Sequence, residues 1–250
     1  MRKSSFYLLS LLSLVSVLSL LSVLLAPLAQ AQTPDFSGFW NAQLVPSPEG
    51  RVLFDKLPPD AVFINDAGAG ELGEGEYSGL QLSDAAKAQV ESYDFAVELT
   101  REFACAAPSV AFYMQAPFPM EIHQDAKLIV FRVEYYDMVR LIFLDGRAHP
   151  PADVPHSKSG HSVGHREGDE LVVDTTHIAS GSFMNNGFSH SDNIRLTERF
   201  KLSADGQTLF LTQVTEDAEV FAGKAARYMS WRKAEGYVYP YDCDPSFGRE

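Results

Sequence analysis

Basic residues and cysteines are both scarce in this 250-residue chain, which has 20 lysines and arginines against 33 acidic residues, and two cysteines. The net charge of −13 disfavours nucleic acid or an anionic membrane surface as a partner, because both are negatively charged. The chain also lacks a Gly-rich phosphate loop between a strand and a helix. Its G-x-S-x-G match, at residues 160–164, lies in a predicted β-hairpin, so the strand-to-helix turn of a nucleophile elbow is absent as well. These absences disfavour nucleotide-dependent and α/β-hydrolase chemistry.

The first 31 residues have the pattern of a signal peptide. Arg2 and Lys3 precede an apolar run from Phe6 to Leu25, and Ala29-Gln30-Ala31 matches a small-x-small cleavage site. We therefore predict cleavage after Ala31, a periplasmic or secreted location, and no membrane insertion of the processed chain. An uncleaved membrane anchor is the alternative, because a run of about 20 residues is long for a signal peptide.

Cys105 and Cys243 both lie in the part of the chain that is expected to be exported. In an oxidising compartment an even pair of this kind most often forms a disulfide, which would tie the middle of the chain to its end. Two buried free thiols are the alternative. Neither cysteine lies in a local motif associated with catalysis.

Residues 32 to 250 are predicted to form a single, mainly β domain. A meander of this size usually closes into a barrel or packs as a sandwich, and we favour an antiparallel, lipocalin-like β-barrel with one flanking helix. Ser83 can cap that helix, which is expected from Asp84 to Arg101. Alternating residues and turn signals predict three hairpins and a last strand, at 128–144, 161–175, 193–215 and 227–233.

The second of these hairpins brings a histidine to a carboxylate. With its turn at Glu167-Gly168, His161 lies directly opposite Asp174 on the antiparallel ladder. Opposed Cβ atoms are about 4.5–5.5 Å apart, close enough for an aspartate to fix the imidazole tautomer and raise its basicity. The pair suits acid–base catalysis or metal ligation.

Glu198 falls on the apolar face of the strand that begins at Asn193. A buried carboxylate is costly unless it is paired or neutral, so this residue is either structural or functional. The same alternation, extended backwards along the chain, places His190 on this apolar face as well.

Between the second and third hairpins, residues 180 to 188 combine Gly and Asn with large apolar side chains. Such a loop covers a barrel mouth or packs onto the core.

The first hairpin repeats the pattern of polar residues on an apolar face. A three-residue loop sets Glu134 opposite Arg140, whereas a two-residue loop sets Glu134 against Val139. The pair is either an internal ion pair that locks the barrel, or it leaves Arg140 to hold an anionic or carbonyl group of a ligand. Glu121, beside a strand start, is a further candidate for this interior cluster, whose apolar members are expected to be Leu128, Val130, Ile142 and Leu144.

Three motifs make the chain resemble a family of exported bacterial proteins. They are D-x-S-G-x-W at 35–40, L-D-G-R-x-H-P at 144–150, and G-H-S-x-G-x-x-E-G-D-x-L-V-V-D-T at 160–175. The resemblance covers most of the chain after residue 31, and it extends to E-I-x-Q at 121, H-S at 190 and E-R-F at 198. Arg166 stands where the family pattern has tryptophan. The resemblance implies a shared site and no particular reaction.

Three functions are compatible with these residues. The first is a cofactor-independent lyase, isomerase or hydratase acting in a barrel pocket. There His161, oriented by Asp174, is the base, Glu198 or Glu121 is the acid, and Arg140 with His190 stabilises an oxyanion or enolate.

The second function is metal-dependent catalysis at a site built from His161, His190 and either Glu121 or Glu198. No H-x-H or H-x-x-x-H spacing occurs among these residues. The third is a non-catalytic protein that holds a small, partly apolar organic molecule. If none of the three applies, the ladder pairs have a structural role only.

Overall fold

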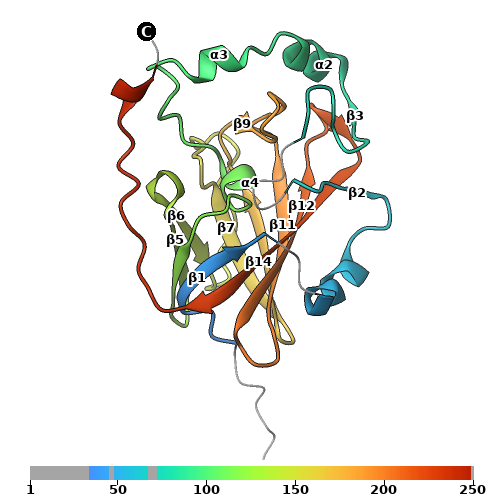
Figure 1. Cartoon of the computed structure of the whole chain (residues 1–250). Coiled ribbons are helices and arrows are strands. Elements are labelled where there is room, and N and C mark those ends of the chain that lie inside the picture. The colour runs from blue at the N-terminus through green and yellow to red at the C-terminus, as the bar shows by residue number, and fades with distance from the viewer. Residues whose placement is uncertain (1–33, 45–47, 67–71, 249–250) are drawn as a thin grey trace, which may run out of the picture. The chain divides into compact units, whose positions relative to one another are not determined.

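The computed structural model describes residues 34–44, 48–66 and 72–248, within which nine strands close into a β-barrel. The predicted fold class is therefore confirmed (Figure 1). The strands in spatial order are β1 (Gly38–Gln43), β4 (Met120–Gln124), β5 (Leu128–Val133), β6 (Met138–Phe143), β7 (His161–Glu167), β8 (Glu170–Thr176), β11 (Arg195–Leu202), β12 (Thr208–Glu216) and β14 (Lys224–Ala234). Pairing of β14 with β1 closes the circle.

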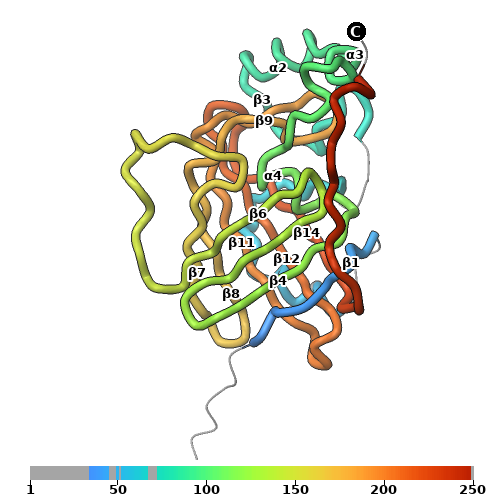
Figure 2. Tube along the Cα trace, turned by 90° about the vertical axis from the view of Figure 1, so that its left-hand side faces the viewer, coloured from blue at the N-terminus to red at the C-terminus, as the bar shows by residue number. Residues whose placement is uncertain are grey.

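Adjacent barrel strands are antiparallel except at one junction. β6 and β7 run parallel over two residue pairs, and the long connection between them projects away from the strands (Figure 2). A parallel neighbour requires such a crossover, because a tight hairpin can only reverse the chain direction. A tenth strand, β2 (Ala61–Phe63), adds to β14 in parallel outside the closed circle.

The β5–β6 hairpin has a longer connection than expected. Val133 pairs with Met138, so residues 134 to 137 connect the strands and form η2 (Tyr135–Asp137). The odd residues of β5 face the core, and Leu128 and Val130 do not. The interior face predicted for this strand is therefore wrong, whereas that predicted for Arg140 and Ile142 in β6 is correct. Five of the six β5 residues are apolar, so alternation could not choose a face.

The β7–β8 hairpin turns one residue later than expected. Its two-residue loop is Gly168-Asp169, between the paired Glu167 and Glu170. Gly168 has φ +63°, a value that the first position of a tight hairpin loop requires and that glycine adopts without strain. Glu167 at that position would have been strained, and this difference decides the register.

The predicted helix is two short helices, α2 (Asp84–Glu91) and α3 (Phe95–Glu98). Ser83 caps α2 as expected, by accepting a hydrogen bond from the Ala86 amide. Asp94 then accepts one from the Ala96 amide and begins a second helix, because short polar side chains at an N-cap compete with helix continuation. Both helices lie across one end of the barrel, and α4 (Val110–Tyr113) lies between them and the strands (Figures 1 and 2).

Shorter elements complete the described chain. They are η1 (Pro48–Lys56), the pair β3 (Gln81–Leu82) and β13 (Phe221–Ala222), the pair β9 (Gly181–Ser182) and β10 (Ser189–His190), and η3 (Pro245–Phe247). The segment spanning β9 and β10 packs Phe183, Met184 and Phe188 into the core. Its apolar side chains therefore anchor it to the barrel.

Cys105 and Cys243 form the predicted disulfide. The C-terminal segment after β14 runs back along the barrel to the end where α3 lies (Figure 2). Tyr241 in this segment stacks on Tyr136 with ring centroids 4.7 Å apart. The disulfide holds the segment against the chain that precedes α4, and the aromatic contact holds it against η2 in the β5–β6 connection.

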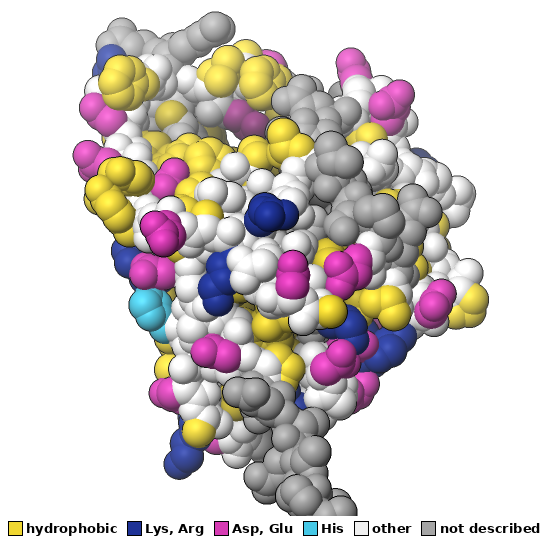
Figure 3. Space-filling model, turned by 60° about the horizontal axis from the view of Figure 1, so that its bottom comes forward, with side chains coloured by type: hydrophobic (Ala, Val, Ile, Leu, Met, Phe, Trp, Pro, Cys, Tyr) yellow, Lys and Arg dark blue, Asp and Glu magenta, His cyan; other side chains and the backbone are white. Residues whose placement is uncertain are grey.

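Residues 34 to 250 belong to one compact unit. In the described part of the chain, no helix is long and apolar enough to cross a membrane. The predicted signal peptide and its cleavage site lie outside the described residues. Acidic and basic side chains are interspersed over the end of the barrel opposite α2 and α3 (Figure 3).

Candidate functional site

A buried ion pair crosses the inside of the barrel wall. The Arg140 guanidinium in β6 makes a bidentate contact with the Glu198 carboxylate in β11, with Nη1 3.2 Å from Oε1 and Nη2 bonded to Oε2. Both side chains are 0% exposed. Burial disfavours the charge on Arg140, but the adjacent carboxylate outweighs it and raises the pKa of the guanidinium.

The strands between β6 and β11 accept two further hydrogen bonds from Arg140. Its Nε donates to Ser162 Oγ at 3.1 Å and its Nη2 to Thr175 Oγ1 at 2.9 Å. Gln213 Nε2 donates to Glu198 Oε1 at 3.1 Å. The ion pair between β6 and β11 is thus held by three further strands, β7, β8 and β12. Arg140 belongs to an internal ion pair as predicted, but its partner is Glu198 and not Glu134.

Glu134 and Glu121 do not belong to this cluster, contrary to expectation. Glu134 precedes η2 and accepts a hydrogen bond from the Tyr239 amide at 3.2 Å. Glu121 lies on the outer face of β4, because Met120 and Ile122 face the core, and pairs with Arg132 at 2.9 Å and His123 at 3.4 Å. Glu121 is thus on the outside of the barrel wall, and Glu134 lies in the connection between β5 and β6.

His161 and Asp174 do not face each other. Because the hairpin turns at Gly168-Asp169, His161 pairs with Thr176 and Asp174 with Val163. Asp174 is exposed and accepts a hydrogen bond from Thr197 Oγ1 at 3.1 Å. The prediction of a His161–Asp174 pair is therefore wrong, and Asp174 is not placed to orient the His161 imidazole.

The neighbour of His161 is a second histidine. The Nδ1 atoms of His149 and His161 are 2.9 Å apart, and the His161 ring stacks on Phe143. Partial burial lowers the pKa of both imidazoles, and each is further affected by nearby charges. Since a hydrogen bond between two imidazoles needs one acceptor nitrogen, at least one ring is neutral.

The residues proposed as metal ligands are dispersed. His161 and Glu121 lie on the outer face of the wall, Glu198 lies inside it, and His190 lies in β10. Within the described residues, no group of three or more His, Cys, Asp or Glu side chains has a geometry that could hold a metal ion. The site predicted from His161, His190 and a glutamate is therefore not assembled.

His190 is buried, as predicted, but its partner was not anticipated. Its Nε2 lies 2.6 Å from Ser109 Oγ, and its Nδ1 lies 2.7 Å from the Ser191 carbonyl oxygen. Burial lowers the pKa of this imidazole. Ser109 begins α4, 81 residues earlier in the chain, and a serine before a short apolar run gives no local signal of this contact.

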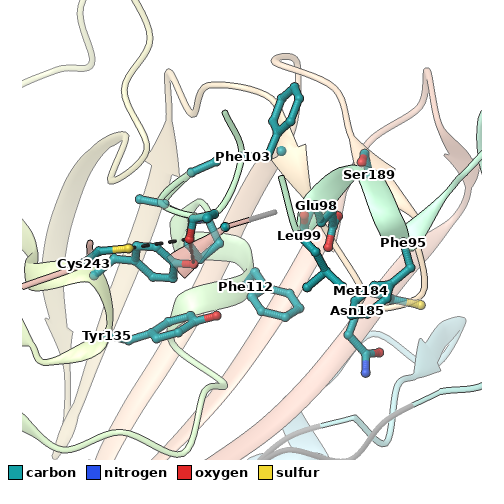
Figure 4. Close-up of a pocket in the computed structure, with 18 of the residues that line it drawn as sticks. Phe95, Glu98, Leu99, Phe103, Phe112, Tyr135, Met184, Asn185, Ser189 and Cys243 are labelled. Carbon is teal, nitrogen blue, oxygen red and sulfur yellow. Dashed lines mark hydrogen bonds between the residues drawn. The ribbon is translucent and has the colours of Figure 1, made fainter. Parts of the chain in front are cut away.

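A cleft of about 1280 Å³ lies at the end of the barrel that carries α3. Its apolar wall includes Phe95, Leu99, Phe103, Phe112, Tyr135 and Met184, and its polar groups include Glu98, Lys158, Asn185 and Ser189. Figure 4 shows Phe112 of α4 in the middle, with Tyr135 on one side and Met184 and Asn185 on the other. This arrangement of aromatic walls and a few polar groups is typical of a small-molecule site.

The cleft is built from segments far apart in the sequence. Leu72 to Pro108, Tyr135 and Tyr136, the β9–β10 pair and the C-terminal segment all contribute to its wall. Sequence reasoning missed it because no single segment carries a motif. In the structure, α3 marks the position of the cleft, because this four-residue helix has no buried residue and its Phe95 is 58% exposed.

Comparison with models of known protein families and with curated protein sequences finds no match. The family resemblance of the three motifs stays a prediction. Function is therefore inferred from the geometry of the cleft and of the buried polar groups.

Proposed function

We propose that this protein binds a small, partly apolar organic molecule in the cleft beside α3. The observation that carries the proposal is the cleft itself, whose volume of about 1280 Å³ exceeds the roughly 300–1,000 Å³ of typical ligand sites. A molecule of that class can therefore enter without displacing the protein core.

The lining gives such a molecule both affinity and orientation. Phe95 and Phe103 are large apolar side chains that stay 58% and 43% exposed, so a ligand that covers them removes apolar surface from water. Lys158 supplies a cation, and burial lowers the pKa of its amine. Glu98 and Asn185 supply further polar groups in the wall.

The interior of the barrel is a less suitable site. Arg140 and Glu198 are 0% exposed and bonded to each other and to their neighbours. A ligand would have to break the ion pair and leave a buried charge unpaired, which costs several kcal/mol. The interior acid–base mechanism also loses its base, because His161 lies on the outer face without Asp174.

We also propose that the protein works outside the cytoplasm. The Cys105–Cys243 disulfide supports this location, since such bonds persist mainly in oxidising compartments. The signal-peptide pattern of the first 31 residues agrees with it.

A matched pair of variants on α3 tests the binding site. Phe95 lines the cleft, whereas Val97 on the same helix is 46% exposed and is not part of the lining. We expect Phe95→Ala to weaken binding of the fluorescent probe 1-anilinonaphthalene-8-sulfonate about tenfold, because roughly 1.4 kcal/mol of apolar contact is lost. Val97→Ala should leave the dissociation constant unchanged. Equal affinities of both variants and the parent protein would contradict the proposal.

A further inference from the structure

Acidic side chains outnumber basic ones in the wall of the cleft. Among the described residues that line it, Lys158 alone is basic, whereas the acidic residues are Glu74, Asp94, Glu98, Asp242 and Asp244. The whole chain has 33 acidic and 20 basic residues, so this wall is more acidic than the protein is on average. A concave surface lined by one sign of charge concentrates ligands of the opposite sign.

Lys158 does not neutralise these acidic groups. Its Nζ donates to the Ser180 carbonyl oxygen at 2.8 Å, and burial lowers the pKa of its amine with no opposing effect from a carboxylate. Since a nearby carboxylate would oppose that shift, Lys158 and the acidic groups occupy separate parts of the cleft. Within the described residues, none of the five acidic side chains forms an ion pair with a basic one. Their charges are therefore available to a ligand.

Glu98 differs from the two acidic residues beside it in the wall that cap short helices. Asp94 accepts a hydrogen bond from the Ala96 amide at 2.8 Å, and Asp244 accepts one from the Ser246 amide at 2.8 Å. Both carboxylates thus have a local structural role. Glu98 caps no helix, because it is the last residue of α3.

Three tyrosines of the cleft wall surround Glu98. They are Tyr93, which lies just before α3, and Tyr135 and Tyr136 of η2. Burial raises the pKa of all three phenols, and the negative charge of Glu98 adds to the rise in each of them. Because the effect of a charge weakens with distance, the Glu98 carboxylate lies close to all three rings.

Phenylalanine side chains frame the same carboxylate. In Figure 4, Glu98 lies in the space between Phe95, Phe103 and Phe112, all of which line the cleft. Phe95 and Phe103 are 58% and 43% exposed, so a ligand can still cover them. The faces of aromatic rings carry partial negative charge. Glu98 is therefore a full negative charge among electron-rich rings.

A carboxylate and aromatic faces together recognise one class of ligand. The faces of tyrosine and phenylalanine rings attract an ammonium group, and a carboxylate supplies the opposite charge. An anionic head group would be repelled by both. We propose that the cleft selects apolar organic molecules that carry a positively charged ammonium group, and that Glu98 determines this specificity. The inference rests on the proposed binding function and names its ligand class.

Two isosteric molecules test the inference, (3-hydroxyphenyl)trimethylammonium and 3-tert-butylphenol. They share one shape and differ by one positive charge, because nitrogen in the first replaces a carbon in the second. Isothermal titration calorimetry of the disulfide-bonded protein gives both dissociation constants, at low ionic strength and at a pH where the phenol groups are protonated. We expect the cation to bind at least about tenfold more tightly, although the neutral molecule is the more apolar.

Glu98→Gln keeps the size of the side chain and removes its charge. We expect the ratio of the two dissociation constants to fall to within about twofold of one, because the main attraction for the cation is lost. Glu102→Gln is the matched control, since Glu102 is exposed, lies four residues further on and is not part of the lining. This control should preserve the ratio. Added salt should lower the ratio in the parent protein, because it screens exposed charges.

The outcomes separate this inference from the proposed function. Equal affinities of the parent protein for the two molecules, or tighter binding of the neutral one, would overturn the cation preference and leave the binding proposal intact. A ratio that persists in Glu98→Gln, or that falls equally in Glu102→Gln, would overturn the role of Glu98. Protein that binds neither isostere but binds 1-anilinonaphthalene-8-sulfonate in a Phe95-dependent manner would also overturn the preference. Absence of binding of all three molecules would contradict the proposed function itself.

Discussion

Replacing Glu198 with alanine leaves the Arg140 guanidinium buried without its counter-charge. The substitution removes the bidentate contact with Arg140 and the hydrogen bond from Gln213, and only Ser162 and Thr175 still accept from the guanidinium. Breaking a fully buried pair in this way costs about 3–5 kcal/mol. In a domain of this size that corresponds to a melting temperature lower by roughly 6–20 °C.

Urea unfolding of the disulfide-bonded protein measures this loss as a change in midpoint. Glu121→Ala is the matched control, because its partner Arg132 is half exposed and such a pair contributes less than about 1 kcal/mol. The double variant Arg140→Met and Glu198→Leu should recover most of the stability, since apolar residues of similar volume replace buried ion pairs at little cost. Equal losses for Glu198→Ala and Glu121→Ala would refute the assignment of Arg140 and Glu198 as the internal lock.

Two further predictions concern the disulfide and pH. Replacing Cys105 and Cys243 with serine opens a link across 138 residues, which in the chain-entropy model lowers the free energy of unfolding by about 5 kcal/mol. The double substitution should also weaken binding of 1-anilinonaphthalene-8-sulfonate, because Cys243 and its neighbours form part of the cleft wall. An unchanged urea midpoint together with an unchanged affinity for this probe would contradict the prediction. Burial lowers the pKa of His149, His161 and His190, so the unfolded chain binds more protons than the folded chain below about pH 6.5. Stability measured by urea unfolding should therefore fall from about pH 6.5 to 5.5, and a constant or rising stability would refute the reasoning.

The sequence anticipated features that depend on neighbouring residues along the chain. The strands of the three hairpins, the Ser83 cap and the burial of Glu198 were all correct, because alternation and turn residues are local properties. The faces of β5 were wrong where nearly every residue is apolar. The helix break at Asp94 was missed because either one capped helix or two satisfied the same apolar pattern.

Pairing across the hairpins was harder to predict, since one residue decides it. The turn at Gly168-Asp169 in place of Glu167-Gly168 moved His161 away from Asp174 and removed the expected dyad. Arg140 was correctly predicted to lie inside the barrel, but its partner Glu198 lies 58 residues away in the chain. A pattern that spans only a few residues cannot identify so distant a partner.

The sequence by itself determined that this chain is mainly β, favoured a barrel over a sandwich and a disulfide over two free thiols, and identified polar residues that are candidates for the interior. Tertiary structure alone decided that Arg140 bonds to Glu198, that Ser109 meets His190, and that several distant segments enclose a cleft. The physical reason is that strand propensity and turn geometry act within a few residues. Contacts between side chains depend on register, closure and packing, which involve the whole chain.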